Sequence, residues 1–427
     1  MHGETSIVLG TATRGLQLAV PIALSQPDRR RHLHVIGKTG TGKSTLLLNL
    51  MLSDLDAGRG FALLDPHGDL AESVVDAVPP ERTNDVLYFN PSDLQHVPAF
   101  NPLDRVPVDQ RPLVAEHLLA AFSLIWDASL EATPRLIYIL LNALRLLLDA
   151  PGSTLLGLPR LLIDDAYRTR LLRTCRDPIV HAFWTKEFAS YDHRFLVSAV
   201  SPIQNKIGVL LSPNALRNII GQRHSTIDIP SIMNTGRVFI ANLSKGKLGP
   251  TSTHLLGAFL ATAFAQAAEA RATMREHDRR DFTLFADEFQ NFATESFASV
   301  LSEARKWRLA LVLAHQYLGQ IPSSLLQAVL GNTGSIIVFR VGASDADRLA
   351  PELGIESPSA LADTANFSAW VKLIRDGTPI EPILIDTIYP EPTHIGRAAA
   401  VVARTRARHT RPRASVEHSI KRFLLSG

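Results

Sequence analysis

The sequence predicts an α/β fold: a mostly parallel β-sheet covered by helices, with an all-α segment inserted into it. Short apolar runs bounded by turn residues alternate with helical segments, which is typical of parallel sheets. Between residues 107 and 221, long leucine-rich stretches with almost no strand signal indicate helices. The runs that we interpret as strands of the sheet are residues 34–36, 61–64, 86–89, 238–242, 283–286, 309–314 and 336–339.

The chain of 427 residues is long enough for two or three domains, and these patterns divide it into four segments. We expect residues 1–106 to hold N-terminal strands, including a strand pair within residues 6–24, and the first part of the sheet domain. Residues 107–225 would form the inserted all-α domain. Residues 226–396 would complete the sheet domain and end in a β-hairpin with an Asp-Gly turn. Residues 397–427 are interpreted as a basic C-terminal tail or an exposed helix.

The composition excludes several classes of protein. The formal net charge of +3 does not by itself indicate a polyanionic partner, so charge has to be considered locally. Cys175 is the only cysteine, which excludes an internal disulfide and a zinc site of paired cysteines. The longest apolar runs, residues 136–148 and 255–268, fall short of the ~20 residues that span a bilayer. With no signal-peptide pattern either, we expect a cytoplasmic protein with no membrane span of its own.

A glycine-rich loop follows the strand at residues 34–36 and precedes a leucine-rich helix. It satisfies the P-loop pattern, in which glycines let backbone N–H groups close around phosphates at a helix N-terminus. Lys43 would reach the β- and γ-phosphates of ATP, Ser44 would place its hydroxyl on Mg²⁺, and Thr45 would lie near the α-phosphate. The loop consists of Gly37, Lys38, Thr39, Gly40, Thr41, Gly42, Lys43 and Ser44.

Two adjacent acids follow the strand at residues 283–286. In an ATP-hydrolysing site Asp287 would hold the hydration shell of Mg²⁺, and Glu288 would polarise the attacking water. An Asp-Glu pair is also common at helix N-caps. Because the phosphate loop is present, hydrolysis is favoured over simple nucleotide binding.

Three more residues are candidates for catalysis. Gln316 follows the strand at residues 309–314 and would sense the γ-phosphate, with a plain strand-end cap as the alternative. Arg305 precedes that strand, and Arg340 ends the next one. Either is a candidate arginine finger for the γ-phosphate of an adjacent subunit, with solvated surface arginine as the alternative.

Contact with DNA is expected at two places. Lys245 and Lys247 lie in a loop after the strand at residues 238–242, where their ammonium groups would meet DNA phosphates. A solvated turn is the alternative there. The C-terminal segment has an electrostatic footprint suited to nucleic acid, although basic tails also bind acidic proteins. Its candidate DNA-binding residues are Arg404, Arg406 and Arg408.

Four motifs of the chain form a familiar set. They begin at His32, Leu64, Asp287 and Ala314, with the sequences HLHVIGKTGTGKS, LDPHG, DEFQ and AHQ. This set resembles the HerA/FtsK superfamily of DNA-pumping ATPases, and within it the type IV coupling proteins of bacterial conjugation. The resemblance covers most of residues 30–350 and implies a RecA-like P-loop NTPase core that uses ATP and Mg²⁺. Coupling proteins also insert an all-α domain between the phosphate loop and the acid pair, as this sequence does.

The resemblance implies a homo-oligomer, a hexameric ring that passes single-stranded DNA, with the helical insertion contacting relaxosome or secretion-channel proteins. By the same comparison Gln316 matches the sensor and Arg305 the trans arginine, with Arg340 as a second candidate. One feature departs from the family. Membrane-bound coupling proteins carry N-terminal transmembrane helices, whereas this chain starts a few dozen residues before the loop. We therefore expect either a cytoplasmic protein that attaches to the inner membrane through a separate partner or a soluble relative of the coupling proteins.

Three other functions fit the sequence. A HerA-like translocase that works with a nuclease in DNA-end processing or defence would share the motifs, although the helical insertion would be an unusual elaboration. A second alternative exports protein rather than DNA. The third is a nucleotide-gated scaffold without turnover, and the intact acid pair argues against it. Over these three alternatives, we expect an ATP-driven, DNA-translocating motor of the coupling-protein type.

Overall fold

The structure is a computed structural model that describes residues 6–12, 19–126, 134–294 and 297–425. It divides into two compact units, each assembled from segments that are far apart in the chain. The sheet unit comprises Met1–Phe89, Ile229–Leu243 and Ala263–Thr405. The helical unit comprises Asn90–Asp228, Ser244–Thr262 and Arg406–Gly427.

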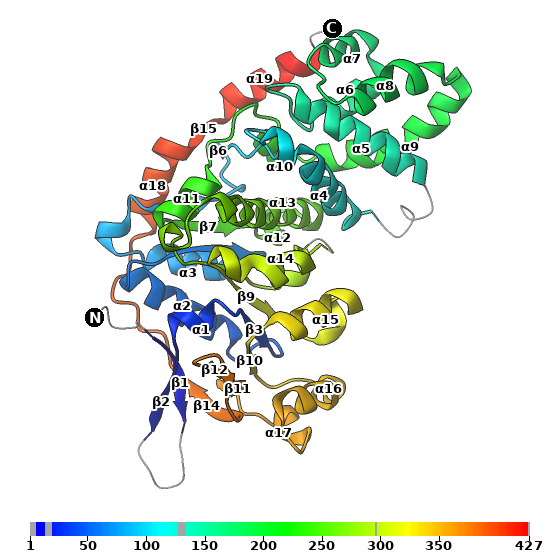
Figure 1. The fold of residues 1–427 in the computed structure, drawn as a ribbon. Coiled ribbons are helices and arrows are strands. Elements are labelled where there is room, and N and C mark those ends of the chain that lie inside the picture. Colours follow the sequence, from blue (N-terminus) through cyan, green and yellow to red (C-terminus); the bar gives the residue numbers. More distant parts are fainter. Residues whose placement is uncertain (1–5, 13–18, 127–133, 295–296, 426–427) are drawn as a thin grey trace. The chain divides into compact units, whose positions relative to one another are not determined.

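The sheet unit is built on one large sheet (Figure 1). Its strands are β1 (Ile7–Ala12), β2 (Val20–Leu24), β3 (Leu33–Ile36), β4 (Gly60–Asp65), β5 (Val86–Phe89), β7 (Val238–Asn242), β8 (Phe282–Ala286), β9 (Leu309–His315), β10 (Ser335–Val338), β11 (Ser368–Lys372) and β14 (Ile383–Thr387). Among the described residues these eleven strands have the order β2-β1-β14-β11-β10-β3-β9-β8-β4-β7-β5. Pairing is parallel from β10 to β5 and antiparallel from β2 to β10.

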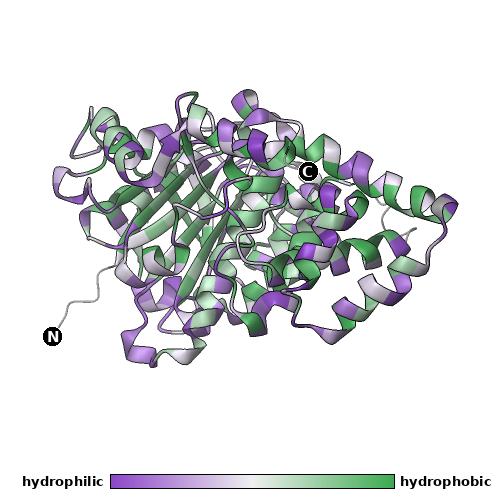
Figure 2. Cartoon of the chain, turned by 90° about the horizontal axis from the view of Figure 1, so that it is seen from above, coloured by the Kyte–Doolittle hydropathy of each residue, from purple (hydrophilic) through white to green (hydrophobic). Residues whose placement is uncertain are grey.

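The parallel strands confirm every strand predicted from the apolar runs. All residues of β3, β4, β5, β7, β8, β9 and β10 are buried. A parallel sheet is covered on both faces, so its strands are continuously apolar rather than alternating. Figure 2 shows these hydrophobic strands lying between helices.

The two predicted hairpins are also present. β1 pairs with β2, and β11 pairs with β14. Between β11 and β14 the short strands β12 (Ile374–Arg375) and β13 (Thr378–Pro379) flank a two-residue turn. The turn residues Asp376 and Gly377 have φ of 51° and 81°, and positive values at both positions are what a type I′ turn requires.

Helices of the sheet unit pack on this sheet and form its core. They are α1 (Gln26–Arg29), α2 (Lys43–Asp56), α3 (Asp69–Asp76), α11 (Ile229–Thr235), α14 (Phe297–Glu303), α15 (Ser323–Asn332), α16 (Ala343–Leu353) and α17 (Ser359–Ala362), while the unit boundary falls within α13 (Pro250–Glu269) and α18 (Ala398–His409). On α2 five apolar residues with the spacing of one helix face are buried in the core, namely Leu46, Leu47, Leu50, Met51 and Leu55.

A buried ion pair joins α1 to α2. Arg29 donates through Nη1 and Nη2 to the two carboxylate oxygens of Asp54, each at 2.8 Å. Arg59 donates from Nε to the same carboxylate at 2.5 Å. The side chain of Asp54 is completely buried, so its charge depends on these two guanidinium groups.

The helical unit contains α4 (Arg111–Ser123), α5 (Pro134–Asp149), α6 (Gly157–Ile163), α7 (Asp165–Leu172), α8 (Pro178–Ala182), α9 (His193–Leu211), α10 (Asn214–Ile220), α12 (Lys245–Leu248) and α19 (Arg413–Leu425). It also holds the antiparallel pair β6 (His96–Pro98) and β15 (Thr410–Pro412). Its core is aliphatic and aromatic, with Phe122 packed edge-on against Phe259 at a centroid distance of 5.9 Å. Two of the leucine-rich stretches that predicted helices between residues 107 and 221 correspond to α4 and α5.

The predicted boundaries of this unit differ from the observed ones. The helical unit begins at Asn90 rather than residue 107 and gathers two later segments, because β6 pairs with β15 and α19 packs against α10. The basic C-terminal segment, expected as a tail or an exposed helix, is folded as α18, β15 and α19 up to Leu425. Val416 and Ile420 lie four residues apart on α19 and are both buried, which is the apolar spacing that a docked helix needs.

Within the described residues, no single helix has the length and apolar character to cross a membrane. One helix pair, Arg194–Leu211 with Asn214–Ile220, meets these criteria when taken together, but it is bent by 99° at the break.

Candidate nucleotide site

The glycine-rich loop connects β3 to α2 at the carboxyl edge of the parallel strands. Gly40 and Gly42 have φ of 78° and 120°, conformations that other residues adopt only with strain. Gly37 lies so close to Phe339 that a Cβ there would come within 2.5 Å of the Phe339 Cβ. The loop is thus held in the shape that presents backbone N–H groups at the N-terminus of α2.

Lys43 places its ammonium group inside this loop. Its Nζ donates to the carbonyl of Gly37 at 2.5 Å and to that of Lys38 at 3.2 Å. Burial lowers the pKa of Lys43, and the carboxylates of Glu288 and Asp287 oppose that effect. The structure therefore brings the loop lysine and the acid pair together, as the sequence predicted.

Asp287 follows β8, which lies between β9 and β4 in the sheet. Its side chain is buried, and its backbone N–H donates to the Leu64 carbonyl at 3.2 Å. Burial, together with the nearby charges of Asp65 and Glu288, raises the pKa of Asp287 to about 7. A divalent cation would favour the charged form of such a carboxyl group, so this position suits a metal ion. Ser44, in the first turn of α2, is exposed and available as a hydroxyl ligand.

Glu288 is held by two amide side chains. Gln316 donates from Nε2 to Oε1 of Glu288 at 2.9 Å, and Gln290 donates from Nε2 to Oε2 at 2.6 Å. Glu288 also has a φ of 47°, a left-handed backbone conformation that is uncommon for residues other than glycine. Its carboxylate is therefore fixed in place by residues from two neighbouring strand ends.

Gln316 connects this acid to the phosphate loop. It directly follows His315, whose carbonyl accepts a hydrogen bond from the Gly37 N–H at 3.3 Å. A pocket of about 650 Å³ opens beside the loop and is lined by Gln316, Lys38 and Thr39, among others. Gln316 therefore lies between the phosphate loop and Glu288.

Asp65 is a buried residue of the site to which the sequence assigned no role. Its Oδ1 accepts from the His67 N–H and its Oδ2 from the Ala71 N–H, both at 2.8 Å. These bonds fix the turn between β4 and α3, and the charge of Asp65 contributes to the raised pKa of Asp287. The signal was present, because an acid follows the apolar run at residues 61–64 just as Asp287 follows its own strand.

Two buried histidines beneath the loop were not predicted. The rings of His34 and His315 are stacked, with centroids 4.9 Å apart and an angle of 7° between their planes. Their Nε2 atoms are 2.6 Å apart, and His315 Nδ1 lies 3.0 Å from the Tyr317 carbonyl. Burial lowers the pKa of both rings, that of His315 to about 4, so both are neutral at physiological pH. They join β3 to β9 directly below the phosphate loop.

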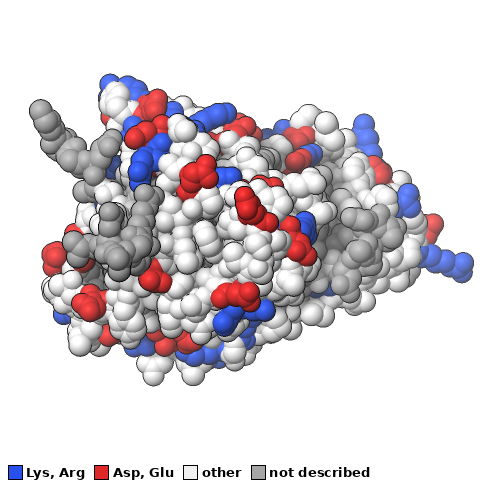
Figure 3. Space-filling view, turned by 90° about the horizontal axis from the view of Figure 1, so that it is seen from below, with Lys and Arg blue, Asp and Glu red and all other residues white. Residues whose placement is uncertain are grey.

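The candidate DNA-binding residues all lie on helices, which differs from the loop expected for the two lysines and matches the exposed helix that was one of the two expectations for the arginines. Lys245 and Lys247 belong to the short helix α12. Arg404, Arg406 and Arg408 lie on α18, where Arg406 forms an ion pair with Asp93 at 2.7 Å. On the face shown in Figure 3, basic and acidic side chains are interspersed among uncharged ones, in keeping with the small net charge.

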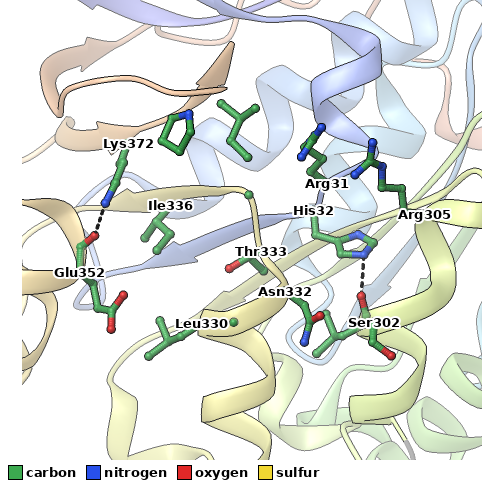
Figure 4. A pocket seen from close by; sticks show the side chains of 15 residues that line it. Arg31, His32, Ser302, Arg305, Leu330, Asn332, Thr333, Ile336, Glu352 and Lys372 are labelled. Atoms are coloured by element: carbon green, nitrogen blue, oxygen red, sulfur yellow. Dashed lines mark hydrogen bonds between the residues drawn. The ribbon is translucent and has the colours of Figure 1, made fainter. Parts of the chain in front are cut away.

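The two candidate arginine fingers lie at opposite ends of the parallel strands. Arg340 follows β10 next to the loop, since its carbonyl accepts from the Lys38 N–H at 2.9 Å and its guanidinium donates to Asn366 at 2.7 Å. Arg305 is exposed and precedes β9, at the amino edge. It lines a pocket of about 400 Å³ together with Arg31 (Figure 4).

A buried parallel strand that runs into a phosphate loop, with acids at the end of a nearby strand, is the architecture of RecA-like P-loop NTPases. A family model for the central domain of helicase HerA matches residues 7–248, which is more than half of the chain. The chain belongs to this family. No curated protein matches it in sequence.

Solved structures with similar folds confirm the predicted fold class. The unbound bacterial conjugative coupling protein TrwB has a TM-score of 0.64 and 16% identity over 91% of this chain and 92% of that chain. TrwB in complex with ADP and Mg²⁺ has a TM-score of 0.63 and 16% identity over 93% and 98% of the two chains. VirB4 of Thermoanaerobacter pseudethanolicus has a TM-score of 0.57 and 15% identity over 91% and 98%.

Proposed function

We propose that this protein is an ATP hydrolase that translocates DNA, as a ring-forming motor of the coupling-protein type. The observation that carries the proposal is the hydrogen bond from Gln316 to Glu288, 2.9 Å long, at the edge of the sheet where the phosphate loop lies. A hydrogen bond between a sensor residue and a catalytic acid can couple hydrolysis to a conformational change. A site that only binds nucleotide does not require such a bond.

The nucleotide would bind with its phosphates against the loop N–H groups. Lys43 already points its ammonium group into the loop and would pair with the β- and γ-phosphates. Thr45 lies in the first turn of α2 and would be near the α-phosphate. Ser44 and Asp287 fit a magnesium ion, because one offers an exposed hydroxyl and the other a carboxyl whose charge needs a cation. Bound Mg²⁺ would neutralise phosphate charge as it develops.

Glu288 would orient the attacking water. Its two amide partners fix the carboxylate, so the group is preorganised for general-base catalysis. When the γ-phosphate leaves, Gln316 would lose a neighbour and shift relative to Glu288. That shift is the local event that a motor would convert into movement of DNA.

Support for a DNA motor comes from the family to which the chain belongs and from the solved structures that share its fold. By analogy with the coupling protein TrwB, we propose a hexameric assembly that acts in conjugative transfer at the inner membrane through a partner. The helical unit would supply the contact with relaxosome or secretion-channel proteins. The family match over residues 7–248 also favours a second candidate, a HerA-like translocase that acts with a nuclease on DNA ends.

The test is ATP turnover by the wild-type protein and by Glu288→Gln, with and without single-stranded DNA. We expect single-stranded DNA to stimulate the wild type. Glu288→Gln should keep its affinity for ATP and lose turnover by about 10² to 10⁴-fold, because only the water-orienting group is removed. The matched control is Glu303→Gln, an exposed acid on α14, which should stay within about twofold.

Different outcomes separate the candidates. Retained turnover in Glu288→Gln would remove this residue from its role. A wild-type protein that binds ATP without hydrolysing it, with or without DNA, would support a scaffold instead. Stimulation by duplex ends rather than by single strands would favour the HerA-like translocase.

A further inference from the structure

The helical unit contains a pocket of about 470 Å³ whose charged lining residues are all basic. It lies where α7, the end of α10 and α19 meet, together with the turn that precedes α6. Arg170, Arg223 and Arg422 contribute to its wall, and no aspartate or glutamate is among the described residues that line it. The three arginines are exposed and come from segments about 50 and 200 residues apart in the chain, so only the fold brings them together.

The acids nearest to this pocket in the sequence are already paired with other arginines. Asp164 bonds Arg160 at 2.8 Å, and Glu417 bonds Arg413 at 2.7 Å. Asp165 forms an ion pair with Arg168. In the described part of the chain, the guanidinium groups of the three pocket arginines have no hydrogen bond or ion pair. Their charge is therefore uncompensated by protein.

One of the three arginines is held by an aromatic ring. Arg170 lies over the ring of Tyr167, 5.2 Å from its centroid, and Tyr167 itself is buried. Hydroxyl groups of Ser153 and Ser419 add hydrogen-bonding capacity to the wall. Burial raises the pKa of Tyr167, and the charges of Arg160, Arg170 and Arg223 oppose that rise. The pocket combines a positive field, a stacked guanidinium and hydroxyl donors.

We propose that this pocket binds a phosphate group, carried either by a nucleic-acid backbone or by a free phosphorylated small molecule. Guanidinium forks match phosphate oxygens in pairs, and three of them around one cavity suit a strongly charged anion better than a single carboxylate. The inference goes beyond the proposed motor function, because the helical unit contains none of the loop or acid residues. It also gives Arg422, in the basic C-terminal segment, a specific place beside two arginines that are distant in the sequence.

The experiment compares two triple variants of the full chain. The pocket variant carries Arg170→Gln, Arg223→Gln and Arg422→Gln. The control carries Arg173→Gln, Arg176→Gln and Arg194→Gln, which removes the same charge from exposed positions of the same unit outside the pocket. Binding of a fluorescent oligothymidylate is measured against salt concentration, and binding of pyrophosphate and of a mononucleotide by calorimetry. Both variants keep the nucleotide loop, so the difference between them reports the pocket.

We expect the pocket variant to bind at least one phosphate probe about tenfold more weakly than the control. If the oligothymidylate is affected, the salt slope should fall by about two, because roughly 0.7 counterions are released per phosphate contact on single strands. A loss confined to pyrophosphate and the mononucleotide would assign the pocket to a small molecule. Turnover of ATP without DNA should be equal in both variants, so this result is independent of the motor proposal.

Equal loss in the two triple variants, or no loss in either, would overturn the proposal, since any binding would then be general electrostatics. A polyglutamate peptide that binds the pocket more tightly than every phosphate probe would overturn it too. If the triple variant fails to fold, as judged by its thermal denaturation, Arg422→Gln alone is used. This single change affects an exposed side chain and should weaken the same probe.

Discussion

At the candidate site, the raised pKa of Asp287 favours the neutral, protonated form of its carboxyl group. Burial is the main cause of the raised pKa, and the negative charges of Asp65 and Glu288 raise it further. The positive charge of Lys43 lowers it by less, so the pKa of Asp287 is about 7. The folded state therefore binds this proton more tightly than the unfolded chain, where an aspartate titrates near 3.9. Stability from this group is complete below about pH 4 and is lost as the pH rises through about 7.

We expect the urea concentration at the unfolding midpoint of the metal-free protein to decrease as the pH rises from about 4 to about 7. Asp287→Asn should flatten the fall, because the amide cannot ionise. Asp363→Asn, a change at an exposed aspartate, serves as the control and should keep the wild-type profile. Urea titrations over this range measure the effect. Profiles of Asp287→Asn and wild type that run parallel would contradict the assignment.

Some site residues could be predicted from the sequence and others could not. Lys43, Asp287, Glu288 and Gln316 each follow a strand that the apolar pattern reveals, and parallel strands bring their carboxyl ends to one edge. Which side chains touch there depends on strand order, and that is set by packing over the whole sheet. The stacking of the two buried histidines depends on that order, because they lie on the neighbouring strands β3 and β9, and it left no sequence signal.

At the scale of elements, continuous apolar runs identified the parallel strands, and helical periodicity identified the long helices of the insertion. The C-terminal helices were harder to predict. Their charge suggested a tail, while the apolar pair Val416 and Ile420 on α19 and the buried Val401 and Thr405 on α18 are sparse signals. An amphipathic helix with so narrow an apolar stripe is stable only once it is docked. Its partner surface could not be known from the sequence.

The connection between α1 and α2 depends on the buried Asp54 carboxylate. We expect Asp54→Ala to destabilise the sheet unit by about 3 to 5 kcal/mol, because it leaves the buried guanidinium of Arg29 without its partner. The comparison is Asp281→Ala, which breaks the more exposed ion pair with Arg30 and should cost about 1 kcal/mol or less. Denaturant unfolding measures both. If the two substitutions lower the free energy of unfolding equally, burial of the Asp54 ion pair does not increase its contribution to stability.

At the scale of the whole molecule, strand length decides how each candidate arginine finger can act. β9 has seven residues, so its two ends are roughly 20 Å apart. Arg305 precedes this strand and Gln316 follows it, which places Arg305 out of reach of the phosphate loop in its own chain. Arg340 lies beside that loop. If Arg305 acts on a nucleotide at all, it acts on one bound by a neighbouring subunit.

Mixed assemblies test this directly. Glu288→Gln and Arg305→Ala should each have little activity alone, but mixing them should restore up to about a quarter of the sites, because one subunit supplies the acid and its neighbour the arginine. The control pair is Glu288→Gln with Arg340→Ala, which should stay inactive if Arg340 acts within its own chain. ATP turnover after co-assembly is the measurement. Absence of recovery with Arg305→Ala, in assemblies shown to be mixed, would argue against the trans role.

The strand order also affects how the chain can fold during synthesis. The first parallel strands to be made, β3, β4 and β5, have no neighbours among themselves in the sheet. Their partners β7, β8, β9 and β10 follow only after most of the helical unit has been made, roughly ten seconds or more later at ordinary rates of translation. Until then three strongly apolar strands have free edges, a state that favours aggregation and calls for chaperones. The insertion that separates the two halves of the nucleotide site therefore makes the growing chain depend on protection while its sheet is incomplete.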